Sequence, residues 1–393
     1  MRGASVQTNG ISPAVAERNG LASAIRATRL IFLVSGLGMA AWAPMVPYAK
    51  ARLGLDEAEL GLLLLAFGGG SMASMPLVGL LTHRFGSRRV ICVGGLMLCL
   101  ALPLLAIAPG AATLALGLLY FGAALGAVDV AMNAHAVEVE RRDGRSLMSG
   151  FHGLFSIGGL GGAAGMSLLL ALGMPLATAA VAVSVLLAVV VATQWPSLID
   201  EPDGAGERAA AFGMPRGIVL VLGLLCFISF LAEGSMLDWS AVFLRDVRGF
   251  SAASAGIGYA AFSVAMALGR LTGDWIVARF GPVLTVRLGA CTAAAGFLLA
   301  SMLAWPPAAL IGFVLVGLGA ANIVPVMFGA AGRLPGTSPG MAIATVTTLG
   351  YAGLLSGPAL IGFLAQISSL AVALAAVAGL LLLTAASARL VRP

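Results

Sequence analysis

The chain contains two similar halves, each built from apolar segments long enough to cross a membrane. One set of residues recurs at a spacing of 195 positions: Phe67, Arg84, Phe85 and Gly86 in the first half, and Phe262, Arg279, Phe280 and Gly281 in the second. A further set recurs at 193 positions: Gly126, Ala127 and Met148, with Gly319, Ala320 and Met341. A duplicated bundle of this kind can hold a site between its halves and open it to either side by rocking.

Long uncharged runs predict twelve membrane spans, six in each half, and hence an all-α membrane protein. Only 10% of the residues are charged, against roughly 25% in soluble domains. Four runs are too long for one span, so each predicts a helical hairpin: 90–128, 146–199, 288–332 and 334–388. Their breaks are expected at 109–110, 173–175, 305–307 and 368–369. The remaining spans are expected near 28–48, 60–82, 217–240 and 256–276.

The placement of arginine and lysine predicts the orientation. With a cytoplasmic N-terminus, seventeen arginines lie inside and four basic residues outside, Lys50, Arg52, Arg245 and Arg248. This bias assigns both termini to the cytoplasm. The net charge of +6 is scattered over loops that flank the membrane, so it does not indicate a nucleic-acid partner.

The same reading divides the chain into four segments. Residues 1–26 lack the apolar region of a signal peptide and are expected to form a disordered cytoplasmic tail. Residues 27–195 form the N-terminal six-helix bundle, 196–215 a cytoplasmic linker, and 216–393 the C-terminal bundle.

Two carboxyl groups lie inside predicted spans, where a charge costs roughly 2.5 to 3.5 kcal/mol. Asp129 is in the fourth span, and Asn133, four residues later, shares its helix face. Asp129 is either a titrating or solute-binding carboxyl, or a structural group that hydrogen-bonds a neighbouring helix. Glu233, in the seventh span, has the same functional interpretation. Its structural alternatives are a bond to a backbone carbonyl or hydration near the outer vestibule.

Asn322 is the repeat partner of Asp129 at the 193-residue spacing. It places a neutral amide where the other half has an acid. Such asymmetry suits one half for ion coupling and the other for solute binding, and the alternative is drift between the two repeats.

The loop after the second span carries Gly79, Leu81, Arg84, Gly86, Arg88 and Arg89 in a fixed order. This order resembles motif A of the major facilitator superfamily, which implies a cytoplasmic gate. His83 occupies the position where the family usually has aspartate, so the acid-mediated latch that the motif implies lacks its acid here.

A degenerate copy of the motif lies in the second half, with Arg270 and Asp274 followed by the repeated Arg279 and Gly281. Arg270 and Asp274 are four residues apart and can pair on one helix face. We interpret both residues as part of the gate, with solute binding as the alternative.

Further residues resemble the MosC-like branch of this superfamily, which is similar to the fucose permease group. The resemblance rests on Trp42-Ala43-Pro44, Asp129 to Asn133, Ser149 to Gly153 and Glu233-Gly234. It implies a sugar-like or inositol-like solute with proton coupling. It also implies that the first, fourth, seventh and tenth spans line a central cavity, where Trp42 could stack on a sugar ring or anchor the interface. His152, early in the fifth span, is interpreted either as a hydrogen-bonded histidine at a helix end or as a residue that contacts Asn133 or the gate.

We therefore expect a monomeric secondary transporter, multi-pass in a bacterial inner membrane and in contact with its lipid, that moves a small polar solute with protons. A proton-driven efflux carrier for amphipathic compounds is the alternative. The spans lack catalytic or metal-ligand motifs, so neither an enzyme nor a metal site is expected. Gly68 to Gly70 lacks the rest of a nucleotide loop, and no cofactor is expected.

Overall fold

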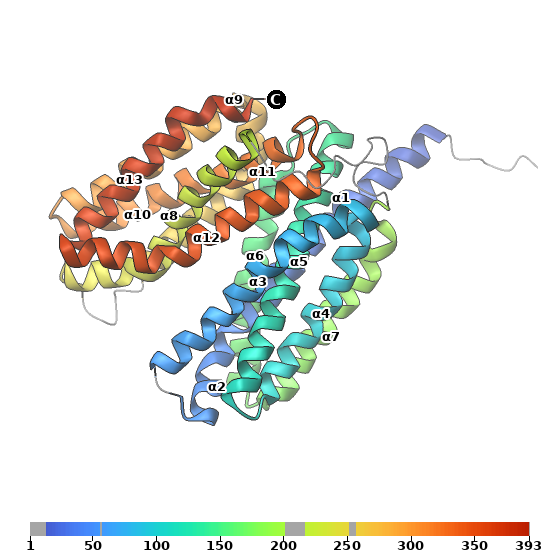
Figure 1. Ribbon diagram of the computed structural model, residues 1–393, viewed down its shortest axis with the longest axis horizontal. Coiled ribbons are helices and arrows are strands. Elements are labelled where there is room, and N and C mark those ends of the chain that lie inside the picture. The colour runs from blue at the N-terminus through green and yellow to red at the C-terminus, as the bar shows by residue number, and fades with distance from the viewer. Residues whose placement is uncertain (1–12, 56, 201–216, 251–256, 393) are drawn as a thin grey trace, which may run out of the picture.

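The computed structural model describes residues 13–55, 57–200, 217–250 and 257–392 and consists of two helical halves (Figure 1). The N-terminal half comprises α1 (Pro13–Ala41), α2 (Val46–Leu53), α3 (Glu57–Phe85), α4 (Ser87–Ile107), α5 (Ala111–Asp143), α6 (Met148–Ala171) and α7 (Leu176–Gln194). The C-terminal half comprises α8 (Ile218–Asp246), α9 (Ile257–Met302), α10 (Pro306–Ala320), α11 (Ile323–Gly332), α12 (Pro339–Ile367) and α13 (Leu370–Ser387). Short 3-10 turns are Ala43–Met45, Trp195–Ser197 and Ala388–Val391.

The predicted twelve spans and the all-α membrane fold are confirmed. Within the described residues, eleven helical segments are long and apolar enough to cross a membrane. One of them, α9, contains two spans, because its backbone bends sharply at Gly281, where φ is 78°. The hairpin breaks lie where the turn formers predicted them, between α4 and α5, α6 and α7, α9 and α10, and α12 and α13.

Two details differ from the sequence-based expectations. Residues from Pro13 onward belong to α1, so the second part of the expected disordered tail is helical. The tenth span is divided into α10 and α11. Pro325 has no N–H to donate to the carbonyl of Ala321, and Asn322 takes a non-helical conformation there. The first twelve residues and most of the expected linker, from 201 on, lie outside the described residues.

Both halves use the same helix pairings, as expected for a duplication. In the first, α1 packs on α6, α3 on α5 and α4 on α7; in the second, α8 packs on α12 and α9 on both α10 and α13. Glycines permit the closest contacts: a Cβ at Gly122 would collide with the Phe67 carbonyl, and one at Gly317 with that of Phe262. These two contacts are related by the 195-residue spacing, so the repeated phenylalanines mark equivalent helix crossings.

Two arginines at the predicted outer end, Arg52 and Arg248, make equivalent contacts in the two halves. Arg52 donates to the carbonyls of Ala106 and Leu105 at the end of α4. Arg248 donates in the same way to Ala300 and Ser301, at 2.6 and 2.9 Å, near the end of α9. A cation at these last carbonyls complements the negative end of the helix dipole.

The contacts between the halves lie toward the end that carries Glu140 and Arg333. There α3 packs on α12 and α6 on α9, while α11 contacts α5 and α6. Figure 1 shows the halves converging near α11 and diverging toward α2. Large apolar side chains remain exposed on the outside of the bundle, such as Leu65, Val93, Leu116 and Leu268. This surface matches acyl chains of a bilayer.

Candidate functional site

A chain of polar contacts lies in the middle of the bundle and begins at Asp129 on α5. Asn133 Nδ2 lies 2.8 Å from the Asp129 carbonyl and 3.3 Å from Asp129 Oδ1. Asn133 Oδ1 lies 3.1 Å from His152 Nε2 on α6, which is one of the contacts that the sequence left open for His152. His152 and Asn133 are both buried, and Phe32 and Phe328 lie against the His152 ring.

The chain continues across the boundary between the halves through Ser156 and Arg270. Ser156 is one turn beyond His152, and its hydroxyl donates to the His152 carbonyl at 3.2 Å. Arg270 Nη1, on α9 of the opposite half, donates to Ser156 Oγ at 3.2 Å. Arg270 Nη2 lies 3.3 Å from both carboxylate oxygens of Glu233 on α8. The two intramembrane carboxyls are therefore joined by contacts that pass from one half to the other.

Arg270 is held in place by the break in the tenth span. Its Nε lies 3.4 Å from the Ala321 carbonyl, the group that Pro325 leaves without a helical donor. Asn322 Nδ2 donates to the Gly269 carbonyl at 3.0 Å. Asn322 therefore contacts α9, and the 193-residue spacing does not give it the surroundings of Asp129.

The predicted pairing of Arg270 with Asp274 is wrong. Arg270 pairs with Glu233, while Asp274 Oδ2 accepts a hydrogen bond from the Gly150 amide at 2.9 Å. The two residues lie on one helix, but Arg270 pairs with a residue of α8 and Asp274 with a residue of α6. The pair with Arg270 gives the largely buried Glu233 carboxylate a counter-charge.

Residues of the predicted gate lie at the junction of α3 and α4. Gly86 has φ of 82°, which allows the tight turn, and Gly281 is its equivalent. Arg88 pairs with Asp200, just after the N-terminal bundle, at 3.1 Å, and Arg84 lies over the Phe85 ring, so neither contact reaches the C-terminal half. Arg89 is exposed, and His83 is partly buried.

Gly79 lies one turn earlier, where α3 contacts α12. A Cβ at this position would lie 2.7 Å from Ala344 Cβ. Gly79 is therefore a residue of the first motif that the structure brings against the opposite half.

Trp42 follows α1 toward α2, is buried, and lies outside the polar chain. His135 lies near the cytoplasmic end of the fourth predicted span, where its position in the sequence indicates a structural role. It bonds Thr28 Oγ1 at 3.1 Å and accepts from the Ile199 amide at 2.9 Å.

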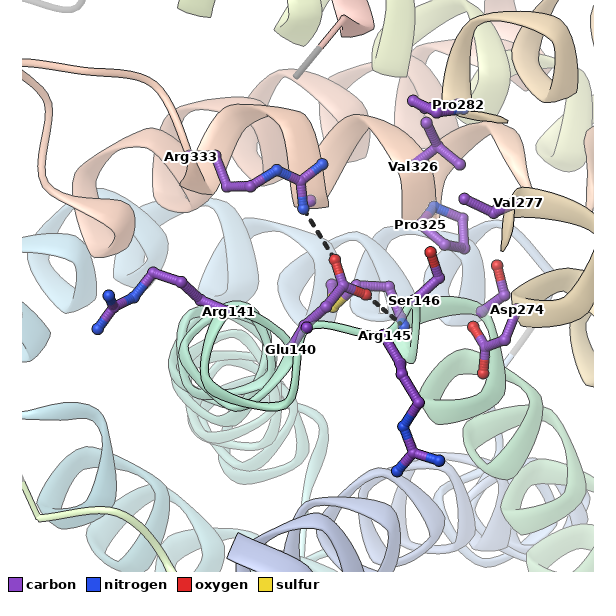
Figure 2. Close-up of a pocket in the computed structure, with 14 residues that line it drawn as sticks. Glu140, Arg141, Arg145, Ser146, Asp274, Val277, Pro282, Pro325, Val326 and Arg333 are labelled. Carbon is purple, nitrogen blue, oxygen red and sulfur yellow. Dashed lines mark hydrogen bonds and ion pairs between the residues drawn. The ribbon is translucent and has the colours of Figure 1, made fainter. Parts of the chain in front are cut away.

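A pocket of about 350 Å³ lies at the boundary between the halves, beside Glu140 and Arg333 (Figure 2). Both halves line it, with Glu140 and Met148 on one side and Asp274, Val326 and Arg333 on the other. Glu140 Oε1 and Arg333 Nη1 are 2.8 Å apart. Sequence reasoning missed this pair and Ser156. A usable signal was present, since Glu140 and Arg333 have opposite charges and are related by the repeat spacing of 193 residues.

Comparison with known proteins gives the family. The model of the Major Facilitator Superfamily matches residues 30–338. An uncharacterized MFS-type transporter of Yersinia pestis is 54% identical over 93% of this chain and 94% of its own. Membrane protein MosC of Rhizobium meliloti is 33% identical over 87% and 84%.

Solved structures agree on the fold. The E. coli fucose:proton symporter FucP has a TM-score of 0.80 at 16% identity, over 94% of this chain and 98% of FucP. The proton:xylose symporter XylE has a TM-score of 0.70 at 14% identity, over 94% and 95%. The chain therefore belongs to the major facilitator superfamily and is a membrane transporter, not an enzyme.

Proposed function

We propose that this transporter moves a small polar organic solute, sugar-like or inositol-like, by alternating access coupled to protons. The observation that supports this most is the polar chain from Asp129 to Glu233. Its carboxyl, amide, imidazole, hydroxyl and guanidinium groups offer hydrogen bonds to a solute that carries hydroxyls. FucP and XylE, which share the fold, are described as proton symporters of sugars.

In this proposal Asp129 carries the coupling proton or anchors the solute, and Glu233 is the second candidate for the same role. Arg270 acts as counter-ion to Glu233 in the arrangement seen here. A change at Glu233 would reach the N-terminal half as well, because Arg270 contacts both Glu233 and Ser156. Asn133, Asn322 and Trp42 are the remaining proposed contacts of the solute. We further propose a monomer in the bacterial inner membrane with both termini cytoplasmic.

A binding screen tests the solute class. Purified protein is heated with sugars, polyols, amino acids and amphipathic cations, and unfolding is followed by tryptophan fluorescence. A bound ligand raises the apparent stability by mass action, by about 2.7 kcal/mol at a hundredfold excess over Kd. Stabilisation by a polyol or sugar supports the proposal. Stabilisation by amphipathic cations alone would favour efflux instead.

The variant Asp129→Asn tests proton coupling. The amide keeps the shape and the contact with Asn133 but cannot titrate. In proteoliposomes, a proton carrier should lose pH-driven accumulation of the screened solute while keeping exchange. Asp238→Asn, at an exposed position of α8, is the matched control and should leave accumulation unchanged. Unaltered pH dependence in Asp129→Asn would make Asp129 structural and Glu233→Gln the next variant.

A further inference from the structure

Tyr351 on α12 lies beside the part of α8 that carries Glu233. Its ring packs against Phe230 of α8, and the two ring centroids are 5.8 Å apart. Phe230 is three residues before Glu233, so both share one face of α8. A Cβ at Gly234 would lie 3.1 Å from Leu354 Cδ1, which brings the next turn of α12 to the same part of α8. Tyr351 is therefore placed near the depth of the Glu233 carboxyl. The eleventh span, which carries Tyr351, is not one of the four that the family resemblance implies as the lining of the cavity.

The face of α12 that carries Tyr351 is directed at the N-terminal half. Ala344 is seven residues before Tyr351 and Leu355 is four residues after it, so the three share one face of the helix. Both neighbours contact α3. A Cβ at Gly79 would lie 2.7 Å from Ala344 Cβ, and one at Gly68 would lie 2.6 Å from Leu355 Cδ2. Tyr351 thus lies at the boundary between the halves, between two places where α12 contacts α3.

The Tyr351 side chain lies in the region of the two intramembrane carboxyls. It interacts electrostatically with Asp129 of the opposite half and with Glu233 of its own half. No residue that the structure describes hydrogen-bonds the Tyr351 hydroxyl, and this hydroxyl is not among the polar atoms sealed inside the bundle. A phenol can both donate and accept a hydrogen bond. The hydroxyl is therefore available to a molecule that enters between the halves.

We propose that Tyr351 contacts the transported solute and hydrogen-bonds one of its hydroxyl groups between Asp129 and Glu233. The inference rests on the function proposed above and adds a residue of the eleventh span to the solute site. A solute hydroxyl in this position can accept from the phenol and donate to a carboxylate. A solute without it leaves the phenol unpaired, so Tyr351 favours solutes that carry a hydroxyl there.

Cysteine labelling tests whether Tyr351 faces open space between the halves. Tyr351→Cys is made in a Cys291→Ser background, because Cys291 is the exposed native cysteine. The purified protein is treated with a charged, water-soluble maleimide. Tyr351→Cys should react, and myo-inositol or xylose should slow the reaction. Leu268→Cys is the matched control, because it lies on the outside of the bundle two residues from Arg270, where detergent covers it, and it should not react. An unreactive Tyr351→Cys would overturn the inference whatever the solute is.

Tyr351→Phe tests the hydrogen bond, because it removes the hydroxyl and keeps the ring against Phe230. The Kd for myo-inositol or xylose, measured by thermal stabilisation, should rise roughly two- to tenfold, the loss of one neutral hydrogen bond. The unliganded variant should unfold at the temperature of the parent protein. Tyr259→Phe is the matched control, since the Tyr259 ring also lies against a phenylalanine, Phe262, at 5.9 Å. It should keep the Kd of the parent.

The outcomes separate this inference from the function proposed above. If the parent protein binds a sugar or polyol and Tyr351→Phe binds it with the same Kd, the role of Tyr351 is overturned and the proposed function stands. If no sugar or polyol binds the parent protein, the proposed solute class is overturned, and the hydrogen bond assigned to Tyr351 with it.

Discussion

Two contacts close the same end of the molecule, and they differ in chemistry although the repeat relates them. On one side, α9 approaches the start of α6, and Asp274 bonds the Gly150 amide. On the other, α3 approaches the start of α12, and Gly79 lies against Ala344. Gly79 and Asp274 differ by 195 positions, and Gly150 and Ala344 by 194.

The start of each helix shows why the two sides differ. Ser338 caps α12 from within its own half, where its Oγ accepts from the Met341 amide at 3.2 Å. Because α6 lacks such a residue, its amides take acids from α5 and α9. Duplication has kept the helix geometry, while one side closes by charge and the other by shape.

The largest effect is expected from Arg270→Met. Arg270 lies on α9, on the side where α9 meets α6, and its contacts with Ser156 and Glu233 are lost in this variant. The substitution leaves Glu233 without its cation, and Arg270 and Glu233 side chains are only 10% and 15% exposed. Removing one partner of a buried pair costs about 3 kcal/mol or more. Thermal unfolding followed by tryptophan fluorescence should show a clear loss of stability. The double variant Arg270→Met with Glu233→Gln should recover most of it. Equal losses in single and double variants would contradict the counter-ion role.

A smaller effect is expected from Gly79→Val, which adds a side chain where α3 packs against α12. The new side chain would meet Ala344 Cβ, which is 2.7 Å from an added Cβ, and the Gly340 carbonyl at 3.2 Å. Overpacking of this kind costs roughly 1 to 3 kcal/mol. Because closure brings these atoms together, the distance between spin labels at Thr193→Cys on α7 and Ala278→Cys on α9, in a Cys291→Ser background, should shift toward the open form. Ala344→Gly in the same chain should restore part of the closed population. If Gly79→Val kept the label distances of the parent protein, the close approach of α3 and α12 at Gly79 would not be needed for closure.

The smallest effect is expected from Ser338→Ala. Losing an N-cap costs about 1 kcal/mol of helix stability. Since this cap lies within one half, apparent stability should fall slightly while the label distances stay unchanged. A shift of the label distances toward the open form would mean that the cap of α12 also contributes to closure. The starts of α6 and α12 would then not differ in this respect.

The sequence by itself determined the fold class, the twelve spans and the duplication. Each follows from local chemistry: uncharged runs of membrane length, turn formers between them, and glycines such as Gly86 and Gly281 whose positive φ ends a helix. The candidate carboxyls Asp129 and Glu233 could also be found, because a charge in an apolar span is conspicuous at any position.

Only the tertiary structure decided which groups meet. Arg270 and Asp274 are suitably spaced to pair along one helix, yet their partners are Glu233 and Gly150, 37 and 124 positions away. Helix periodicity says which residues share a face, but not which neighbouring helix that face contacts or at what depth. Glu140 and Arg333 form an ion pair only because α5 packs against α11 in the folded protein. A side chain's role in a bundle depends on its distance to other helices, and that distance is a property of the assembled halves.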